Sequence, residues 1–290
     1  MYIVLGGTGH VGSALVENLL SRGEKVTLVA RDRTKARRLE ARGARVVIAD
    51  IGDVDALRRV YREGERLYML NPPADPSTDT QARERETVSS MVRALEGSGI
   101  KKVVAHSTFG ARPGELVGDL NVLYEMEEAV KRTGIPTSVL RAAYYMSNWD
   151  TALATAKEGV VKSFFPVELK FAMVAPRDLG ETAANLMMAP IEQCECVYVE
   201  GPIRYSSGDV AAAFAAALGR EVRVETIPER DWIDTFRKLG FSERAAISYA
   251  NMARTVFEPY FPPDSSTVHG KISLGEYVRN RLAPPAGNVT

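Results

Sequence analysis

The sequence begins MYIVLGGTGHVGSALVENLL (residues 1–20), and the glycine loop GGTGHVG at residues 6–12 decides the fold. This loop directly follows a short apolar run at 2–5 and opens an amphipathic stretch at 11–22. A short apolar run is typical of a buried strand, whereas apolar residues spaced three and four apart predict a helix. The loop is therefore expected to join a strand to the N-terminus of a helix.

A glycine loop in this position is suited to bind phosphate. The first N–H groups of a helix have no intrahelical acceptor, and the helix dipole places positive potential beside them. Glycines also let the backbone turn tightly and approach a pyrophosphate. The spacing is GxxGxxG rather than GxGxxG, and the strand–loop–helix context favours a dinucleotide site over a turn without a ligand. We expect Gly6, Gly7, Gly9 and Gly12 to form this site.

The residues after the second predicted strand, at 26–30, bear on which dinucleotide is bound. An acidic side chain about 20 residues beyond the glycines favours NAD, because it accepts a hydrogen bond from the ribose 2′-OH. Here Arg31 and Lys35 carry positive charge that suits the 2′-phosphate of NADP, whereas Asp32 would serve NAD if it turned inward. The sequence therefore favours NADP(H) and leaves NAD(H) open.

Strand and helix signals alternate through the first 140 residues. Such alternation predicts βαβ units, a parallel sheet and right-handed crossovers. We expect an α/β fold with a Rossmann-like, doubly wound parallel sheet over residues 1–148, to which 172–201 return. A smaller α+β lobe for substrate or partner is expected from 149–171 and 202–290, mainly in the C-terminal half. The first six predicted strands are 2–5, 26–30, 45–50, 66–70, 101–107 and 136–141.

Polar residues or prolines lie at the carboxyl ends of three of these strands, where ligands bind in open α/β sheets. The alternative for each position is an ordinary cap or turn. These positions are Asp50 and Ile51, expected beside the adenine, Asn71, Pro72 and Pro73, expected on the path to the nicotinamide, and Ser107 and Thr108, expected to place hydroxyls near the same crevice.

Composition excludes several other classes of function. The 290-residue chain carries 37 basic and 37 acidic side chains, so it has no overall field that would attract nucleic acid or an anionic membrane. Its apolar runs are shorter than the roughly 20 residues of a membrane helix, and no signal peptide is evident. Its two cysteines, Cys194 and Cys196, fit a reducing, cytoplasmic setting, and no metal site accompanies them. The oligomeric state is not indicated.

Three further segments accompany the glycine loop: VARDRTKA at 29–36, IADIGDVDAL at 48–57, and a GI-x-x-x-x-LR pattern at 134–141. Together they resemble the NmrA-like family of atypical short-chain dehydrogenase/reductase proteins, over nearly the whole chain. The family includes NAD(P)H-dependent quinone reductases, plant phenylpropanoid reductases and non-catalytic redox-sensing regulators. The resemblance implies contacts of Thr8, His10 and Val11 with the pyrophosphate and of Arg31 and Lys35 with the 2′-phosphate.

The usual catalytic pair of this superfamily is incomplete. Many members use Tyr-x-x-x-Lys, in which the lysine lowers the phenol pKa from about 10. Tyr124 lies on the corresponding predicted helix, but the fourth residue after it is Glu128, whose carboxylate would raise that pKa. The resemblance retains a glutamate at Glu127 but places Leu123 where many relatives carry His or Lys. Tyr124 and Glu127 are therefore the catalytic candidates.

Aromatic residues follow the sixth predicted strand, where this fold places its substrate lobe. Flat acceptors can stack on such rings, although they are equally suited to a lobe core. The pocket candidates are Tyr144, Tyr145, Asn148 and Trp149. His106, within the fifth strand, is interpreted as a packed structural residue rather than a proton donor.

Hydride transfer requires no protein nucleophile, because the reactive carbon belongs to the nicotinamide. The sequence therefore predicts an NADP(H)-dependent oxidoreductase of a small, flat acceptor such as a quinone or an enone. The alternative is a non-catalytic NADP(H) sensor that binds a regulated protein partner. A sugar-nucleotide epimerase is disfavoured, because it needs the Tyr–Lys pair.

Overall fold

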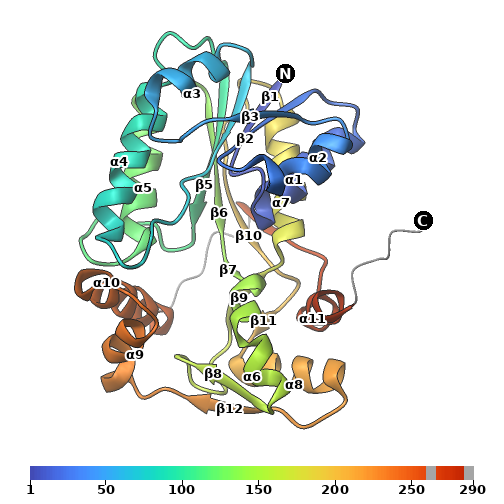
Figure 1. The fold of residues 1–290 in the computed structure, drawn as a ribbon, viewed down its shortest axis with the longest axis vertical. Helices are drawn as coiled ribbons and strands as arrows, with labels where there is room; N and C mark the ends of the chain where they lie inside the picture. Colours follow the sequence, from blue (N-terminus) through green and yellow to red (C-terminus); the bar gives the residue numbers. More distant parts are fainter. Residues whose placement is uncertain (259–265, 284–290) are drawn as a thin grey trace.

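The structure, a computed structural model, describes residues 1–258 and 266–283. An eight-stranded sheet, in the order β3-β2-β1-β4-β5-β6-β10-β13, occupies its upper half in Figure 1, and all neighbouring strands are parallel. From β3 to β6 this is the doubly wound order, in which the two halves of the sheet meet between β1 and β4. The strands are β1 (Tyr2–Leu5), β2 (Val26–Ala30), β3 (Arg45–Ile48), β4 (Arg66–Met69), β5 (Lys102–Thr108), β6 (Thr137–Ala142), β10 (Cys196–Glu200) and β13 (Thr267–His269).

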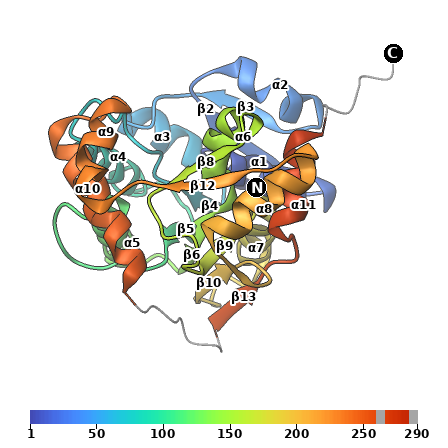
Figure 2. The ribbon, with the colours of Figure 1, turned by 90° about the horizontal axis from the view of Figure 1, so that it is seen from below.

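Helices cover both faces of this sheet. Alternate residues of a strand point to opposite faces, so Val4 packs with α1, α2 and α7, whereas Ile3 and Leu5 pack with α3, α4 and α5. Figure 2 shows these two sets on opposite sides of the strands. Burial on both faces explains why the strands read as continuous apolar runs. The helices are α1 (His10–Ser21), α2 (Arg33–Ala41), α3 (Val54–Tyr61), α4 (Thr80–Arg93), α5 (Asp119–Lys131) and α7 (Pro176–Met188).

The lower half of Figure 1 contains two small sheets and the remaining helices. One aromatic cluster, which includes Trp149, Phe165 and Phe171, forms the centre of this half, and a second surrounds Trp232 and Phe236. Its strands are β7 (Tyr144–Tyr145), β8 (Val160–Ser163), β9 (Phe171–Val174), β11 (Arg204–Tyr205) and β12 (Arg223–Thr226). Its helices are η1 (Met146–Ala152), α6 (Leu153–Lys157), α8 (Ser207–Leu218), η2 (Glu229–Asp231), α9 (Trp232–Lys238), α10 (Glu243–Arg254), η3 (Thr255–Phe257) and α11 (Leu274–Leu282).

The parallel, doubly wound sheet confirms the predicted fold class, and the first six strands lie within two residues of their predicted ends. The expected assignment of 202–290 to the smaller lobe needs one correction, because β13 pairs with β10 in the large sheet. Only three residues of β13 join the sheet, which is too short for a periodic signal. Residues 259–265 and 284–290 of that segment lie outside the described residues. No helix in the described ranges is long and apolar enough to cross a bilayer.

The packing of α7 on α1 depends on Gly180. A Cβ atom on this residue would lie 2.5 Å from the Cβ of Ala14 and 2.7 Å from the backbone nitrogen of Leu15. Real side chains do not approach so closely, so only glycine lets the two helices touch here. Since α1 also carries the glycine loop, this contact helps to hold the loop in place.

We predict that Gly180→Ala lowers the free energy of unfolding by about 1–3 kcal/mol, because the added methyl group forces α7 away from α1. The matched control is Gly275→Ala in α11, where the nearest atom to the added Cβ is 3.5 Å away. That control should leave stability unchanged or raise it by up to about 1 kcal/mol. Urea unfolding measures the stability of both variants, and equal effects of the two substitutions would contradict the close packing of α7 on α1 at Gly180.

Candidate functional site

The glycine loop connects β1 to α1 at the carboxyl edge of the sheet. Gly6 adopts a φ of +66°, and the N–H of Gly9 donates to the carbonyl oxygen of Gly6 at 3.0 Å. A Cβ on Gly12 would lie 2.2 Å from that same oxygen, and one on Gly7 would lie 2.8 Å from the Cβ of Leu28. The loop is therefore pressed against the helix and the sheet in a way that only glycine permits.

The N-terminus of α1 is exposed and uncapped. Helices α2, α3 and α4 each begin with an aspartate whose side chain accepts from a backbone N–H: Asp32, Asp53 and Asp79. By contrast, α1 begins at exposed Gly9 and His10, and within the described residues it has no capping side chain and no acid in its first turn. Its first N–H groups and the positive end of its dipole remain available to an anion.

The basic side chains that follow β2 differ in whether they form ion pairs. Arg31 and Lys35 are exposed, and neither forms an ion pair with any residue that the structure describes. Of the neighbouring arginines, Arg33 pairs with Glu40, and Arg38 and Arg42 pair with Glu17, whereas the exposed Arg37 has no ion pair with a described residue. The Asp32 side chain accepts the N–H of Thr34 at 2.8 Å as the cap of α2. The available charge beside the glycine loop is therefore positive.

The ends of β3 and β4 carry the next predicted residues. Asp50 is exposed and accepts the N–H of Gly52, with the half-buried Ile51 between them. The Asn71 side chain donates to the backbone oxygen of Glu84 at 3.3 Å, and Pro72 and Pro73 follow it. The Asn71 Oδ1 atom is buried and has no hydrogen-bond donor among the described residues. An amide donor on a ligand would satisfy it.

The end of β5 differs from the prediction. Ser107 is buried, and its hydroxyl donates to the Oε1 atom of Glu127 at 2.5 Å, so this hydroxyl is bound to α5 and not free in the crevice. Its position in the strand, which alternates faces, turns the side chain toward α5. Thr108, one residue further, is half-buried, and its hydroxyl lies 3.5 Å from the carbonyl oxygen of Ala142.

Glu127 has a structural role in this arrangement. Arg141 donates to both of its carboxylate oxygens, at 3.0 and 2.8 Å, and Ser107 donates to one of them. The Glu127 side chain is 1% exposed. Both carboxylate oxygens of this catalytic candidate are engaged in holding α5 to β5 and β6. Tyr124 is half-buried on α5, and its hydroxyl has no hydrogen-bond partner within the described chain.

His106 lies in a hydrogen-bonded chain that the sequence did not predict. Its Nδ1 atom is 2.6 Å from the hydroxyl of Tyr68 on β4, and its Nε2 atom is 2.5 Å from the hydroxyl of Tyr145 on β7. Burial lowers the pKa of His106 to about 4, so the imidazole is neutral at physiological pH. His106 is buried, as interpreted, but it also connects to a tyrosine at the carboxyl edge of the sheet.

The four predicted pocket residues separate in the structure. Tyr144 and Trp149 pack into the aromatic cluster of the lower half, with their ring centroids 6.1 Å apart and Tyr144 5.4 Å from Phe171. Asn148 is exposed. Tyr145 alone contacts His106. Tyr144 and Trp149 are therefore part of the core of the smaller lobe, which was the alternative to a role in stacking on an acceptor.

Two buried carboxyl groups lie near this end of the sheet. Glu84 on α4 is 4% exposed, and its Oε1 atom accepts the N–H of Ala74 at 3.0 Å. Asp119 begins α5, and its Oδ1 atom is buried without a hydrogen-bond partner in the described part of the chain. Burial raises the pKa of Asp119 to about 6, and burial together with the charge of Asp119 raises the pKa of Glu84 to about 8.

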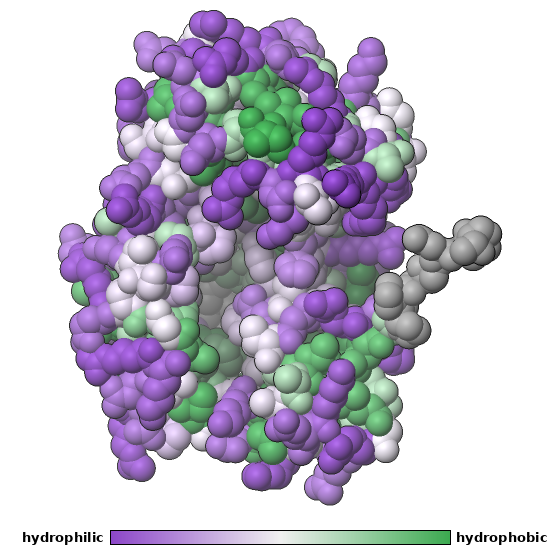
Figure 3. Space-filling model, viewed as in Figure 1, coloured by the Kyte–Doolittle hydropathy of each residue, from purple (hydrophilic) through white to green (hydrophobic). Residues whose placement is uncertain are grey.

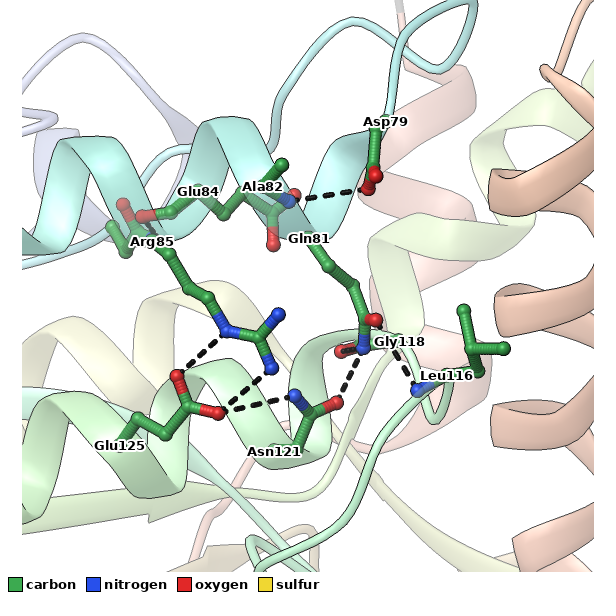
Figure 4. A network of polar contacts seen from close by, with 10 residues as sticks. Asp79, Gln81, Ala82, Glu84, Arg85, Leu116, Gly118, Asn121 and Glu125 are labelled. Atoms are coloured by element: carbon green, nitrogen blue, oxygen red, sulfur yellow. Dashed lines mark hydrogen bonds and ion pairs between the residues drawn. The ribbon is translucent and has the colours of Figure 1, made fainter.

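A network of polar contacts holds together α4 and α5, the helices that carry these two carboxyl groups (Figure 4). Arg85 donates twice to Glu125, at 2.8 and 2.9 Å, and the side-chain amides of Gln81 and Asn121 are hydrogen-bonded. Gln81 also accepts the N–H of Leu116, a residue with a φ of +54°, which orders the loop that leads into α5. The α10 helix contacts the start of α5, because its Ser248 hydroxyl accepts the N–H of Gly118.

Figure 3 shows that the molecule is hollowed between its upper and lower halves, below the sheet. The carboxyl ends of the strands face this crevice, as ligand sites in open α/β sheets require (Figure 1). The anion-attracting N-terminus of α1 and the Tyr145 hydroxyl both belong to this edge. No cluster of three or more His, Cys, Asp or Glu side chains in the described residues is arranged to hold a metal ion.

Comparison with known proteins agrees with this geometry. A model of the NmrA-like family matches residues 2–268. An NAD(P)H azoreductase from Xenophilus azovorans is 26% identical over 248 residues, which cover 85% of this chain and 84% of that protein.

Two solved structures share the fold over almost the whole chain. An NADPH-dependent quinone oxidoreductase from Escherichia coli, complexed with NADPH, superposes with a TM-score of 0.79 at 20% identity, covering 98% of this chain and 100% of that one. A triphenylmethane reductase from Citrobacter sp., complexed with NADP(H), gives 0.80 at 18% identity, covering 97% and 99%.

We predict that Glu84→Gln flattens the dependence of stability on pH. A carboxyl group whose pKa is raised in the folded protein stabilises the fold below its unfolded pKa, and this contribution is lost as the pH rises toward about 8. Glutamine carries no charge and can still accept the N–H of Ala74. The variant should therefore gain stability relative to the native chain between about pH 5 and pH 8, by about 1.4 kcal/mol per unit of pKa shift removed.

Urea unfolding at a series of pH values measures this difference. The control is Glu86→Gln, an exposed residue paired with Arg83, whose stability curve should run parallel to that of the native chain. A parallel curve for Glu84→Gln as well would contradict the prediction.

Proposed function

The chain belongs to the NmrA-like family, and on that premise we propose that it is an NADP(H)-dependent oxidoreductase that reduces a small, flat acceptor such as a quinone. The observation that carries the proposal is the glycine-bounded, uncapped N-terminus of α1 beside Arg31 and Lys35, two cations that form no ion pair with a described residue. A pyrophosphate and a 2′-phosphate are the anions that this pair of features would bind together.

The residues along the crevice suit the other parts of the cofactor. We propose that Asp50 and Ile51 border the adenine, and that the unsatisfied Oδ1 atom of Asn71 accepts from the carboxamide of the nicotinamide. When bound, the nicotinamide supplies the hydride. The further residues proposed to line the cofactor are Gly6, Gly7, Thr8, Gly9, His10, Val11, Gly12, Pro72, Pro73 and Thr108.

The acceptor class follows from the incomplete Tyr-x-x-x-Lys pair and from the similar proteins. An acceptor that takes hydride readily can be reduced without a Tyr–Lys pair, and positioning alone contributes up to roughly 7–11 kcal/mol in model reactions. The names of the similar proteins state azo, quinone and triphenylmethane reduction, and such acceptors are conjugated and electron-poor. These names support, for this chain, an electron-poor aromatic acceptor.

We predict acceptor-dependent oxidation of NADPH by the purified protein. Incubation with menadione should remove the absorbance of reduced nicotinamide faster than in a protein-free control. The sensor alternative predicts the opposite, namely tight NADPH binding without oxidation. Binding of NADPH with no acceleration for any member of a quinone and azo panel would contradict the proposed activity.

Arg31→Ala should weaken NADPH binding by about 1–3 kcal/mol, because it removes a charge-assisted hydrogen bond to the 2′-phosphate. NADH binding should barely change. The matched control is Arg33→Ala, since Arg33 is already paired with Glu40 and should contribute little to either cofactor. Calorimetric titration measures the four affinities, and an equal loss for NADPH and NADH would exclude the 2′-phosphate contact.

A further inference from the structure

Three side chains from three strands form one continuous hydrogen-bonded chain at the centre of the molecule. Tyr68 on β4, His106 on β5 and Tyr145 on β7 are linked through the two ring nitrogens of the histidine, at 2.6 and 2.5 Å. Tyr68 is fully buried and His106 is 3% exposed, while Tyr145 is only partly buried. The chain therefore runs from the core to the partly buried Tyr145, which follows β6 at the carboxyl edge of the sheet.

Burial of Tyr68 determines which way the protons point. Among the described residues its hydroxyl has no hydrogen-bond partner other than the Nδ1 atom of His106. A buried O–H group without an acceptor is costly, so Tyr68 donates to Nδ1. Burial lowers the pKa of His106 and keeps the ring neutral, and its single proton is then on Nε2. His106 consequently donates to the oxygen of Tyr145.

This orientation leaves the O–H proton of Tyr145 free to point elsewhere. Its oxygen already accepts from His106, so the hydroxyl can donate to a group in the crevice. Burial and, second, the charge of Asp119 raise the pKa of Tyr145, so the phenol remains protonated through the neutral range. Tyr124, the tyrosine that the superfamily pattern selects, has no comparable neighbour, since no hydrogen bond positions its hydroxyl within the described chain.

We propose that Tyr145 is the catalytic proton donor to the reduced acceptor and that His106, held by Tyr68, is its positioning residue. This inference rests on the proposed reductase function. A quinone that receives the hydride becomes a hydroquinone monoanion, and the O–H proton of Tyr145 passes to its oxygen, which yields the neutral hydroquinone. The tyrosinate, stabilised by the Nε2–H group of His106, regains its proton from water. One hydride and one proton are consumed for each quinone.

The test compares two acceptors that differ in their need for a proton. Menadione needs a hydride and a proton, whereas the cationic dye crystal violet takes the hydride on carbon and becomes neutral without one. Tyr145→Phe should lower kcat for menadione by at least about 100-fold, which is the low end for a general acid, and change kcat for crystal violet by less than about threefold. The native rate with menadione should also fall in deuterium oxide, and this isotope effect should vanish in Tyr145→Phe.

The outcomes separate this inference from the proposed function. A native protein that reduces neither acceptor fails the proposed function and the inference together. A native protein that reduces menadione while Tyr145→Phe does so equally well keeps the function and overturns the inference. An equal loss with both acceptors overturns it too, because Tyr145 would then serve binding or folding. NADPH binding by the variant confirms that it is folded.

The role of His106 has its own control. In His106→Leu the oxygen of Tyr145 loses its donor, and kcat for menadione should fall by about tenfold, equivalent to one neutral hydrogen bond. In His106→Gln a side-chain N–H group can replace the donor, and part of the rate should return. The KM for menadione and the rate with crystal violet should be unchanged in both variants. A glutamine variant no faster than the leucine variant would show that His106 serves packing alone.

Discussion

The close contact between the first turn of α1 and the turn that precedes it is the constraint on which the rest of the site depends. Because Gly12 has no side chain, the carbonyl of Gly6 can lie where a Cβ atom would otherwise be. The helix therefore starts directly at the end of β1, with its free N–H groups at the carboxyl edge of the sheet. Gly180 fixes the same helix from the other side by admitting α7. Gly12 and Gly180 together therefore determine where the N-terminus of α1, the candidate anion site, lies.

The features of the fold that depend on residues close together in the sequence could be predicted. The apolar runs of the strands, the glycine loop and the positive charges of Arg31 and Lys35 each lie within a short segment, so the sequence pattern alone predicts them. The sequence does not show which of the exposed arginines near Arg31 form ion pairs, because the pairing of Arg33 with Glu40 depends on the geometry of α2. The strand β13 was not predicted, because three residues are too few to show the alternation of apolar and polar side chains that indicates a strand.

The polar interior could not be predicted because its partners are far apart in the sequence. His106 meets Tyr68, 38 residues away on the paired strand β4, and Tyr145, 39 residues away on β7 of the three-stranded sheet. Likewise, the face of β5 on which Ser107 lies decides that its hydroxyl meets Glu127 instead of the crevice. A motif names residue types, but only strand register and helix packing decide which of these groups meet.

The structure buries carboxyl groups in two different ways, and the difference bears on chemistry. Glu127 is fully compensated by Arg141 and Ser107, as a buried charge requires. Glu84 and Asp119 form no ion pair with any cation in the described part of the chain, and burial raises the pKa of both. In tyrosine–lysine reductases a cation makes the phenol a stronger acid, whereas here burial and Asp119 make Tyr145 a weaker one. A weak acid gives little help to an unreactive carbonyl but suffices for an acceptor that takes hydride readily. On the proposed function, the protonated phenol of Tyr145 suits an acceptor that takes hydride readily better than an unreactive carbonyl.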